Sequence, residues 1–136
     1  MKVLFDTNVV LDVLLDRKPF SGIATRLFAR VEKGELSGII GATTITTLHY
    51  LLAKSYGRDQ ALRRVRILLQ LFEIAAVDRN VLELAAALAA SDYEDAVLHE
   101  AGRLHGAEAV VTRDPEGFRE ATLLILSPED LEAALS

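Results

Sequence analysis

The stretch Lys2-Val3-Leu4-Phe5-Asp6-Thr7-Asn8 decides how this chain begins to fold. Residues 3–5 are apolar without interruption, which is typical of a strand that is buried on both faces of a parallel sheet. The run ends abruptly at Asp6, and helical spacing of apolar residues follows over 9–14. The chain therefore starts with a strand and a helix, and a carboxylate lies where the one passes into the other.

Short apolar strands and amphipathic helices alternate along the rest of the chain. Strands are predicted at 37–42, 72–77, 109–112 and 123–126, and helices at 20–33, 43–56, 59–71, 79–90, 92–105 and from 127 onward. Such alternation predicts a mostly parallel sheet with helices on both faces. The sequence shows no repeat, low-complexity tract or linker, and 136 residues suit one domain. We therefore expect a single α/β domain over residues 1–136.

The composition excludes several kinds of chemistry. The chain has no cysteine, so it offers no disulfide, thiolate nucleophile or zinc–thiolate site. Its first residues do not read as a secretory signal, because a charged leader, a long apolar run and a small-residue cleavage site are lacking. The longest stretch without an acidic or basic residue is 36–53. It is rich in Gly and Thr and does not resemble a membrane span of about 20 residues. We expect a cytoplasmic protein without a membrane segment.

The net charge of −5 argues against a wide phosphate-binding face. It does not exclude a nucleic-acid substrate, because metal-binding carboxylates add negative charge and basic residues can cluster locally. Two such clusters exist, and they consist of Arg58, Arg63, Arg64 and Arg66 on one segment and of Arg113 and Arg119 around Asp114. Solvated helix faces are the simpler interpretation of the first cluster.

Acidic residues follow two predicted strands. Asp6 comes after the first strand and Asp114 after the fourth, and ligands of open α/β sheets bind outside the carboxyl ends of strands. If these strands are neighbours, the two carboxylates face each other. Asp92 and Asp95 lie on one face at the start of the helix over 92–105, which the capping-box pattern 91–94 opens. The four carboxylates are expected to form one cluster at an edge of the sheet.

Converging carboxylates repel one another, and their convergence is tolerable mainly when a cation lies between them. Mg²⁺ and Mn²⁺ favour oxygen ligands, and they can orient a water while neutralising a phosphate. Each position also has a simpler interpretation. Asp6 can cap the first helix, Asp92 and Asp95 suit the positive end of a helix, and Asp114 before Pro115 is an ordinary turn. The coincidence at one edge favours a metal site for phosphodiester cleavage.

Other catalytic motifs are lacking from the sequence. It contains no Gly-rich phosphate loop, no G-x-S-x-G and no Ser-His-Asp set with a credible spacing. His49, His99 and His105 do not indicate zinc, because residues 99 and 105 do not share a helical face and no cysteine supports them. Oxygen ligands are therefore expected to carry the chemistry.

Three stretches together resemble the PIN domain family. They are Leu4-Phe5-Asp6-Thr7-Asn8-Val9-Val10-Leu11-Asp12, Asp92-Tyr93-Glu94-Asp95-Ala96 and Val110-Val111-Thr112-Arg113-Asp114. The resemblance covers essentially the whole chain and implies a three-layer α/β/α fold with a five-stranded parallel sheet in the order 3-2-1-4-5. It also implies Mg²⁺- or Mn²⁺-dependent ribonuclease activity. Short bacterial or archaeal members are often the toxin of a VapBC-type toxin–antitoxin pair, which makes RNA the implied substrate and an antitoxin a possible partner.

The resemblance also assigns roles to residues. Asp6, Asp95 and Asp114 match the main acidic positions and are the implied metal ligands, with Asp6 and Asp95 as the primary ones. Asp92 resembles an additional acid at the same helix start, and it and Asp114 would bind through water or position the nucleophile. The polar supports beside them, expected to orient Asp6, are Asn8 and Thr112.

One position departs from the family pattern. Many members carry a Glu on the helix after strand two, where this chain has Thr47. A subgroup with a similar Thr-Thr-Leu-aromatic-Tyr stretch also lacks that Glu. The departure leaves open a second interpretation, in which the chain is a catalytically weak or inactive module that binds RNA or a partner protein. The resemblance also implies a homodimer, since the apolar faces of the helices over 43–56 and 59–71 exceed what one small sheet needs.

Two other classes also place an aspartate at a strand end. A phosphohydrolase with an aspartyl nucleophile normally has a second Asp where Asn8 stands, and it uses a longer chain. A receiver domain needs paired acids after strand one and a phosphorylatable Asp after strand three, where Asp78 is the only candidate. Both interpretations fit the sequence less well than a metal-dependent nuclease.

Overall fold

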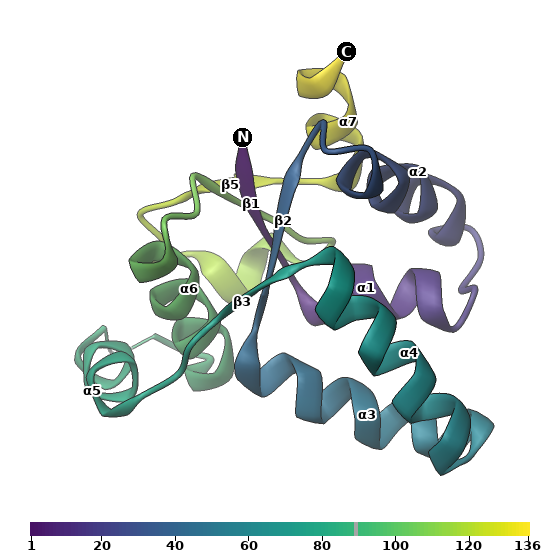
Figure 1. The fold of residues 1–136 in the computed structure, drawn as a ribbon. Helices are drawn as coiled ribbons and strands as arrows, with labels where there is room; N and C mark the ends of the chain where they lie inside the picture. Colours follow the sequence, from purple (N-terminus) through teal and green to yellow (C-terminus); the bar gives the residue numbers. More distant parts are fainter. Residues whose placement is uncertain (89) are drawn as a thin grey trace.

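The computed structural model describes residues 1–88 and 90–136, which fold into three layers (Figure 1). The central layer is a five-stranded sheet in the order β3-β2-β1-β4-β5, and all neighbouring strands are parallel. Its strands are β1 (Lys2–Phe5), β2 (Ser37–Gly41), β3 (Glu73–Ala75), β4 (Ala109–Val111) and β5 (Leu124–Leu126). The predicted three-layer fold and strand order are confirmed.

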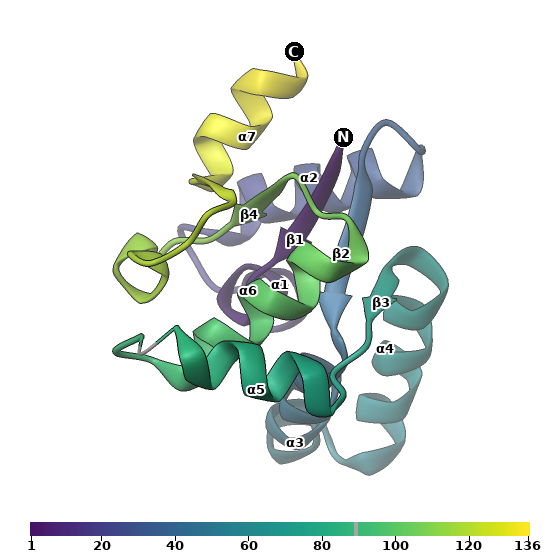
Figure 2. The same ribbon diagram turned by 90° about the vertical axis from the view of Figure 1, so that its left-hand side faces the viewer.

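Helices cover both faces of the sheet. One face packs against α1 (Thr7–Leu14), α2 (Ser21–Glu32), α3 (Ala42–Tyr56), α4 (Arg58–Leu71) and α7 (Pro128–Leu135). The other face packs against α5 (Arg79–Ala87) and α6 (Tyr93–His105), which lie in front of the strands in Figure 2. None of the helices in the described part of the chain is long and apolar enough to cross a membrane.

Side chains of the strands alternate between two cores, as the period of two along a strand requires. Val3 and Phe5 are fully buried in the larger core, where Phe5 meets the rings of Phe28 and Phe72 edge to face. Leu4 points into the second core, beneath α6. Gly102 allows α6 to approach closely there, because a Cβ at this position would come within 2.9 Å of Leu4 Cδ2. The core thus holds α6 tightly against β1.

Two local features differ from the sequence-based expectation. The N-cap of α6 is Asp92 rather than Ser91, because the Asp92 side chain accepts a hydrogen bond from the backbone N–H of Asp95 at 3.1 Å. The expected capping box was therefore wrong by one residue. A 3₁₀ turn, η1 (Pro115–Phe118), also follows β4, where only a turn at Asp114-Pro115 was expected. Both differences lie beside the acidic residues.

Candidate active site

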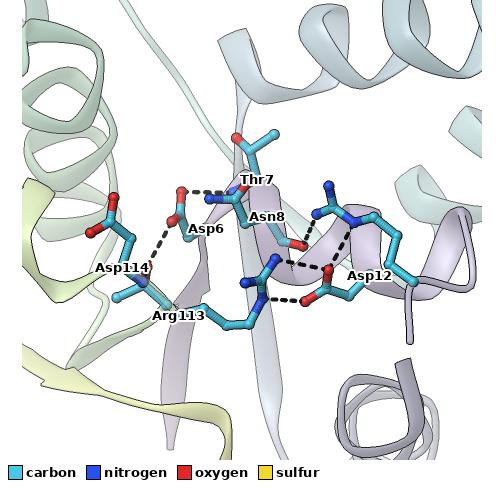
Figure 3. A network of polar contacts seen from close by, with 8 residues as sticks. Asp6, Thr7, Asn8, Asp12, Arg113 and Asp114 are labelled. Atoms are coloured by element: carbon cyan, nitrogen blue, oxygen red, sulfur yellow. Dashed lines mark hydrogen bonds and ion pairs between the residues drawn. The ribbon is translucent and has the colours of Figure 1, made fainter. Parts of the chain in front are cut away.

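Asp6 lies where the first strand, the fourth strand and helix α1 meet (Figure 3). Its Oδ1 accepts a hydrogen bond from the backbone N–H of Thr7 at 2.8 Å, so the carboxylate caps α1. Its Oδ2 accepts a bond from Thr112 Oγ1 at 2.7 Å, which crosses from β1 to the end of β4. Thr112 Oγ1 in turn accepts the backbone N–H of Asp114 at 2.9 Å. The capping interpretation is correct, and the same carboxylate is also tied to the second acidic strand end.

The Asp6 carboxylate is buried, and no Lys, Arg or His of residues 1–88 and 90–136 forms an ion pair with it. Its residue is 6% exposed, and burial is the main cause that raises its pKa above the ordinary value of 3.8. The hydrogen bonds from Thr112 and Thr7 act in the opposite direction, while the charges of Asp114 and Asp92 raise the pKa further. Acids from β4 and the start of α6 are therefore near enough for their charges to act on Asp6.

Asp95 is the most perturbed of the four acids. Burial raises its pKa to about 7, and the negative charges of Asp6, Asp92, Asp114 and Glu94 raise it in the same direction. Glu94 was not expected to contribute, although its place in the first turn of α6 is visible in the sequence. A carboxylate that holds its proton near neutral pH marks a functional site when it lies among other acids.

The turn η1 covers Asp95 on one side. A Cβ at Gly117 would overlap Oδ2 of Asp95, so only glycine lets the backbone of η1 lie this close to the carboxylate. Phe118 follows and is buried in the core beneath α6. Sequence reasoning missed Gly117, because nothing local distinguishes this glycine from one in an ordinary loop.

A second network holds the two acidic strand ends together from the side of helix α1. Asp12 is 1% exposed, and its Oδ2 accepts Arg113 Nε at 2.7 Å while its Oδ1 accepts Arg17 Nε at 2.9 Å. Figure 3 shows Arg113 reaching toward Asp12 while Asp114 lies on the other side, near Asp6. The Arg113 guanidinium also stacks on the ring of Phe20, 3.8 Å from its centroid. Arg113 is therefore a structural anchor of the loop that carries Asp114.

The other expected supports have different surroundings. The carbonyl of Asn8 accepts Arg17 Nη2 at 2.9 Å, and no hydrogen bond joins the Asn8 side chain to Asp6 among the described residues. Thr112 and the backbone of Thr7 hold Asp6 instead. Thr47 Oγ1 donates to the carbonyl of Thr43 at 3.3 Å, so its hydroxyl is turned back onto helix α3. Thr47 therefore adds no charge near the four acids.

The two basic clusters differ in their ion pairs. Arg119 lies 3.6 Å from Glu116 at the surface, and Arg113 is bound to Asp12 as described. In the part of the chain that the structure describes, the first cluster forms no ion pair and lies on α4. Its members are Arg58, Arg63, Arg64 and Arg66.

The donor set fits a hard divalent cation. Asp6, Asp92, Asp95 and Asp114 are oxygen donors, and over residues 1–88 and 90–136 none of them forms an ion pair with a Lys, Arg or His. A divalent cation would offset the mutual repulsion that raises the pKa values of Asp6 and Asp95. No three His, Asp or Glu side chains of the described residues are close enough to form a complete metal site as they stand. Asp6, Asp95 and Asp114 are the residues that would hold such an ion.

Two of the three histidines form contacts of their own. His99 is buried and bonds to Glu100 and to backbone amides, and His105 lies 2.9 Å from Glu73.

Comparison with known proteins identifies the family. The family profile of the PIN domain matches residues 2–116, so the chain belongs to the PIN domain family. No curated protein sequence matches the chain. The observed strand order also differs from the 2-1-3-4-5 order of receiver domains, and family membership leaves the aspartyl phosphohydrolase interpretation without support.

Several solved structures that this chain resembles are of toxins or of toxin–antitoxin complexes. A toxin–antitoxin complex from Klebsiella pneumoniae contains a chain with 25% identity and a TM-score of 0.70, and the match covers 93% of this chain and 97% of that one. VapBC-1 from nontypeable Haemophilus influenzae matches with 13% identity and a TM-score of 0.72, over 95% and 99% of the two chains. VapC20 from Mycobacterium tuberculosis, a sarcin–ricin loop cleaving toxin, matches with 17% identity and a TM-score of 0.68, over 85% and 92%.

Proposed function

We propose that this protein is a Mg²⁺- or Mn²⁺-dependent endoribonuclease and the toxin of a toxin–antitoxin pair. The observation that carries the proposal is the set of four carboxylates at the carboxyl edge of the sheet, which have no cation partner in the described residues; burial, together with the charges of the neighbouring acids, raises the pKa of Asp95 among them to about 7. Membership of the PIN domain family and the likeness to VapC20, a toxin that cleaves the sarcin–ricin loop, support the same activity.

The residues of the site have distinct tasks in this proposal. Asp6 and Asp95 are the primary metal ligands, and Asp114 and Asp92 bind through water or position the attacking water. Thr112 holds Asp6 through its 2.7 Å hydrogen bond and holds the backbone of Asp114 through the same hydroxyl oxygen. A bound divalent cation would neutralise the phosphate and lower the pKa of a bound water.

Cleavage of a structured RNA tests this proposal directly. We expect cleavage with Mg²⁺ or Mn²⁺, no cleavage with EDTA, and a loss of cleavage in Asp6→Asn. Asp130→Asn changes an exposed aspartate on helix α7 that is not one of the four acids, and it serves as the matched control, which should cleave like the wild type. Equal cleavage with metal and with EDTA, or full activity of Asp6→Asn, would remove the idea.

The second candidate is a PIN-fold module that binds RNA or a partner protein without cutting. The observation that favours it is Thr47, whose hydroxyl bonds to its own helix where many family members have a Glu. Calorimetric titration with Mn²⁺ separates the two candidates. No binding at millimolar metal, combined with RNA binding in a gel-shift assay, favours the module.

The proposed partners follow from the same comparisons. Several similar structures are complexes of toxins with their antitoxins, and some of these include DNA. An antitoxin is therefore a proposed partner of this chain. We also propose a homodimer, because five of the large exposed apolar side chains lie on α3 and α4, namely Tyr50, Tyr56, Leu62, Ile67 and Leu69. A monomer in sedimentation velocity at micromolar concentration would contradict the dimer.

A further inference from the structure

A second polar network lies buried next to the candidate active site, on helix α6. His99 comes one helical turn after Asp95 and is 3% exposed. Its Nδ1 lies 2.8 Å from Oε2 of Glu100. Its Nε2 lies 3.1 and 3.2 Å from the backbone nitrogens of Thr122 and Leu123. The ring therefore joins α6 to the connection between β4 and β5.

The hydrogen-bond partners determine the tautomer of this ring. Backbone N–H groups only donate, so Nε2 accepts both of them, and Nδ1 carries the hydrogen that is donated to Glu100. Glu100 is 4% exposed and accepts Arg103 Nη2 at 2.9 Å, and this guanidinium keeps the pKa of Glu100 below its ordinary value. Histidine suits this place because its two ring nitrogens can donate on one side and accept on the other.

The segment that His99 holds is the one that covers Asp95. The connection over 112–123 begins at Thr112, which is bound to Asp6, and ends at the two amides that His99 accepts. Between these anchors lie Asp114 and the turn η1, whose Gly117 packs against the Asp95 carboxylate. Each end of the connection is thus fixed by a buried side chain.

We infer that His99 is a positioning residue of the active site, which holds the 112–123 connection over Asp95 and so sets the positions of Gly117 and Asp114 relative to that carboxylate. The inference rests on the proposed function only in its effect on metal binding and cleavage. The hold itself is a property of the metal-free protein.

The hydrogen bonds of His99, and not the volume of its ring alone, are expected to fix the connection. The amides of Thr122 and Leu123 precede β5, whose pairing with β4 begins at Leu124, so the ladder between these strands does not use them. Thr122 is exposed and Leu123 half-buried, so without His99 their N–H groups would lose a buried acceptor and would have to turn toward water. An apolar side chain of similar volume fills the space but offers neither donor an acceptor from α6. The connection would then shift to find other partners.

Three substitutions at this position separate acceptor chemistry from volume. His99→Gln places a carbonyl oxygen about where Nε2 lies, His99→Asn retains an amide that is too short to reach Thr122 and Leu123, and His99→Leu fills the space without a polar atom. His105 lies at the other end of the same helix, paired with Glu73, so His105→Gln and His105→Asn are matched controls. Leu131→Ala, in the buried face of α7, is a control for loss of stability alone.

Amide exchange in the metal-free protein gives the first measurement. We expect the amides of Thr122 and Leu123 to exchange at least tenfold faster in His99→Asn and His99→Leu than in the wild type, while His99→Gln stays near the wild type. The ¹H–¹⁵N shift of Gly117 should move in the first two variants and stay in the third. Unchanged exchange and an unchanged Gly117 shift in His99→Asn would overturn the inference, and this result would stand whether or not the protein binds metal.

Metal affinity and kinetics give the second measurement. Partners that orient metal ligands typically change affinity or activity by 10–100-fold. We expect His99→Asn to bind Mn²⁺ about tenfold more weakly and to lower kcat more than it raises KM, with rescue by His99→Gln. If Leu131→Ala, at an equal loss of Tm, weakens Mn²⁺ binding as much, the role of His99 is structural only and the inference fails. Absence of Mn²⁺ binding in the wild type would contradict the proposed function instead, and the exchange data would still test the hold.

Discussion

Asp6 and Asp12 are two buried aspartates on adjacent turns of the same strand–helix unit, yet their surroundings are opposite. Asp12 accepts hydrogen bonds from two guanidinium groups, those of Arg17 and Arg113. Among the described residues, Asp6 accepts from the hydroxyl of Thr112 and the backbone N–H of Thr7, and burial together with the charges of Asp114 and Asp92 raises its pKa. Two arginines neutralise the charge of Asp12, whereas no basic side chain of the described residues forms an ion pair with Asp6. Burial of an acid therefore does not reveal its role, whereas the presence or lack of a cation partner does.

We expect the largest effect on stability from substitution of Asp12, the acid that is paired with two arginines. Asp12→Ala leaves the half-buried guanidinium groups of Arg17 and Arg113 without their shared buried carboxylate, and breaking such a pair costs up to about 3–5 kcal/mol. We expect urea unfolding at pH 7.5 to show a loss of that size. Glu83→Ala breaks an exposed ion pair with Arg79 on α5 and should cost about 0.5 kcal/mol or less. Similar losses in both variants would erase the distinction between Asp12 and a surface acid.

Substitution of Asp6, the acid without a basic partner, should have the opposite effect: stability is retained and activity is lost. Asp6→Asn keeps an acceptor for Thr112 and removes a buried charge, so the free energy of unfolding without metal should stay equal or rise at pH 8. Loss of a metal ligand should slow RNA cleavage by about 10²–10³-fold, equivalent to several kcal/mol of transition-state stabilisation. A variant that loses stability as Asp12→Ala does, and keeps its activity, would show that Asp6 is structural.

The pH dependence of stability should reveal the raised pKa of Asp95. Its pKa of about 7 in the folded protein exceeds the ordinary 3.8, so the folded state holds the proton more tightly than the unfolded state. The contribution of Asp95 to the free energy of unfolding therefore falls as pH rises from about 4 to about 7. With allowance for solvent screening of this half-exposed group, we expect a loss of about 1–2 kcal/mol.

The measurement compares the wild type with Asp95→Asn by urea unfolding in EDTA at pH 5 and pH 8. The wild type should lose stability relative to the variant between these two values. Added Mn²⁺ should restore stability to the wild type at pH 8 more than at pH 5, because the ligands must be deprotonated. A difference between the two proteins that does not change with pH would contradict the raised pKa.

The smallest effect is expected at the turn beside Asp95. Gly117→Ala pushes a methyl group against the end of the Asp95 side chain, which can turn away at little cost to stability. Displacement of that carboxylate should weaken Mn²⁺ binding by about fivefold, or roughly 1 kcal/mol. Gly22→Ala on α2, where a Cβ meets only an ordinary contact with Arg26, is the matched control. An equal Mn²⁺ affinity in Gly117→Ala and in the wild type would show that the turn does not position Asp95.

The positions of the acids without a basic partner could be predicted from the sequence, whereas the pairing of Asp12 with Arg113 could not. Asp6 and Asp114 follow strands whose apolar runs are local signals, and the alternation of strands and helices brings such strand ends to one edge. The partner of Asp12 is Arg113, 101 residues away, and no local pattern connects the two. Arg113 belongs to a basic cluster whose neighbour Arg119 lies at the surface, so composition gave no hint of its burial.

The surroundings of Asp95 were hidden for related reasons. The N-cap of α6 was misplaced by one residue because Ser91 and Asp92 are both good caps, and only the contact with the N–H of Asp95 decides between them. The roles of Gly117 and His99 depend on how the β4–β5 connection crosses α6, which is a tertiary contact. Local signals thus located the acids, and long-range packing set their environments.

The bond between Thr112 and Asp6 spans 106 residues, and this distance sets the order of events during synthesis. The chain leaves the ribosome from its N-terminus, and a domain generally folds as a unit. A nascent chain that ends before residue 92 has β1, β2 and β3 but lacks β4, Asp95 and Asp114. It carries only one of the site's acids, so the proposed metal site cannot form until the last third of the chain has emerged.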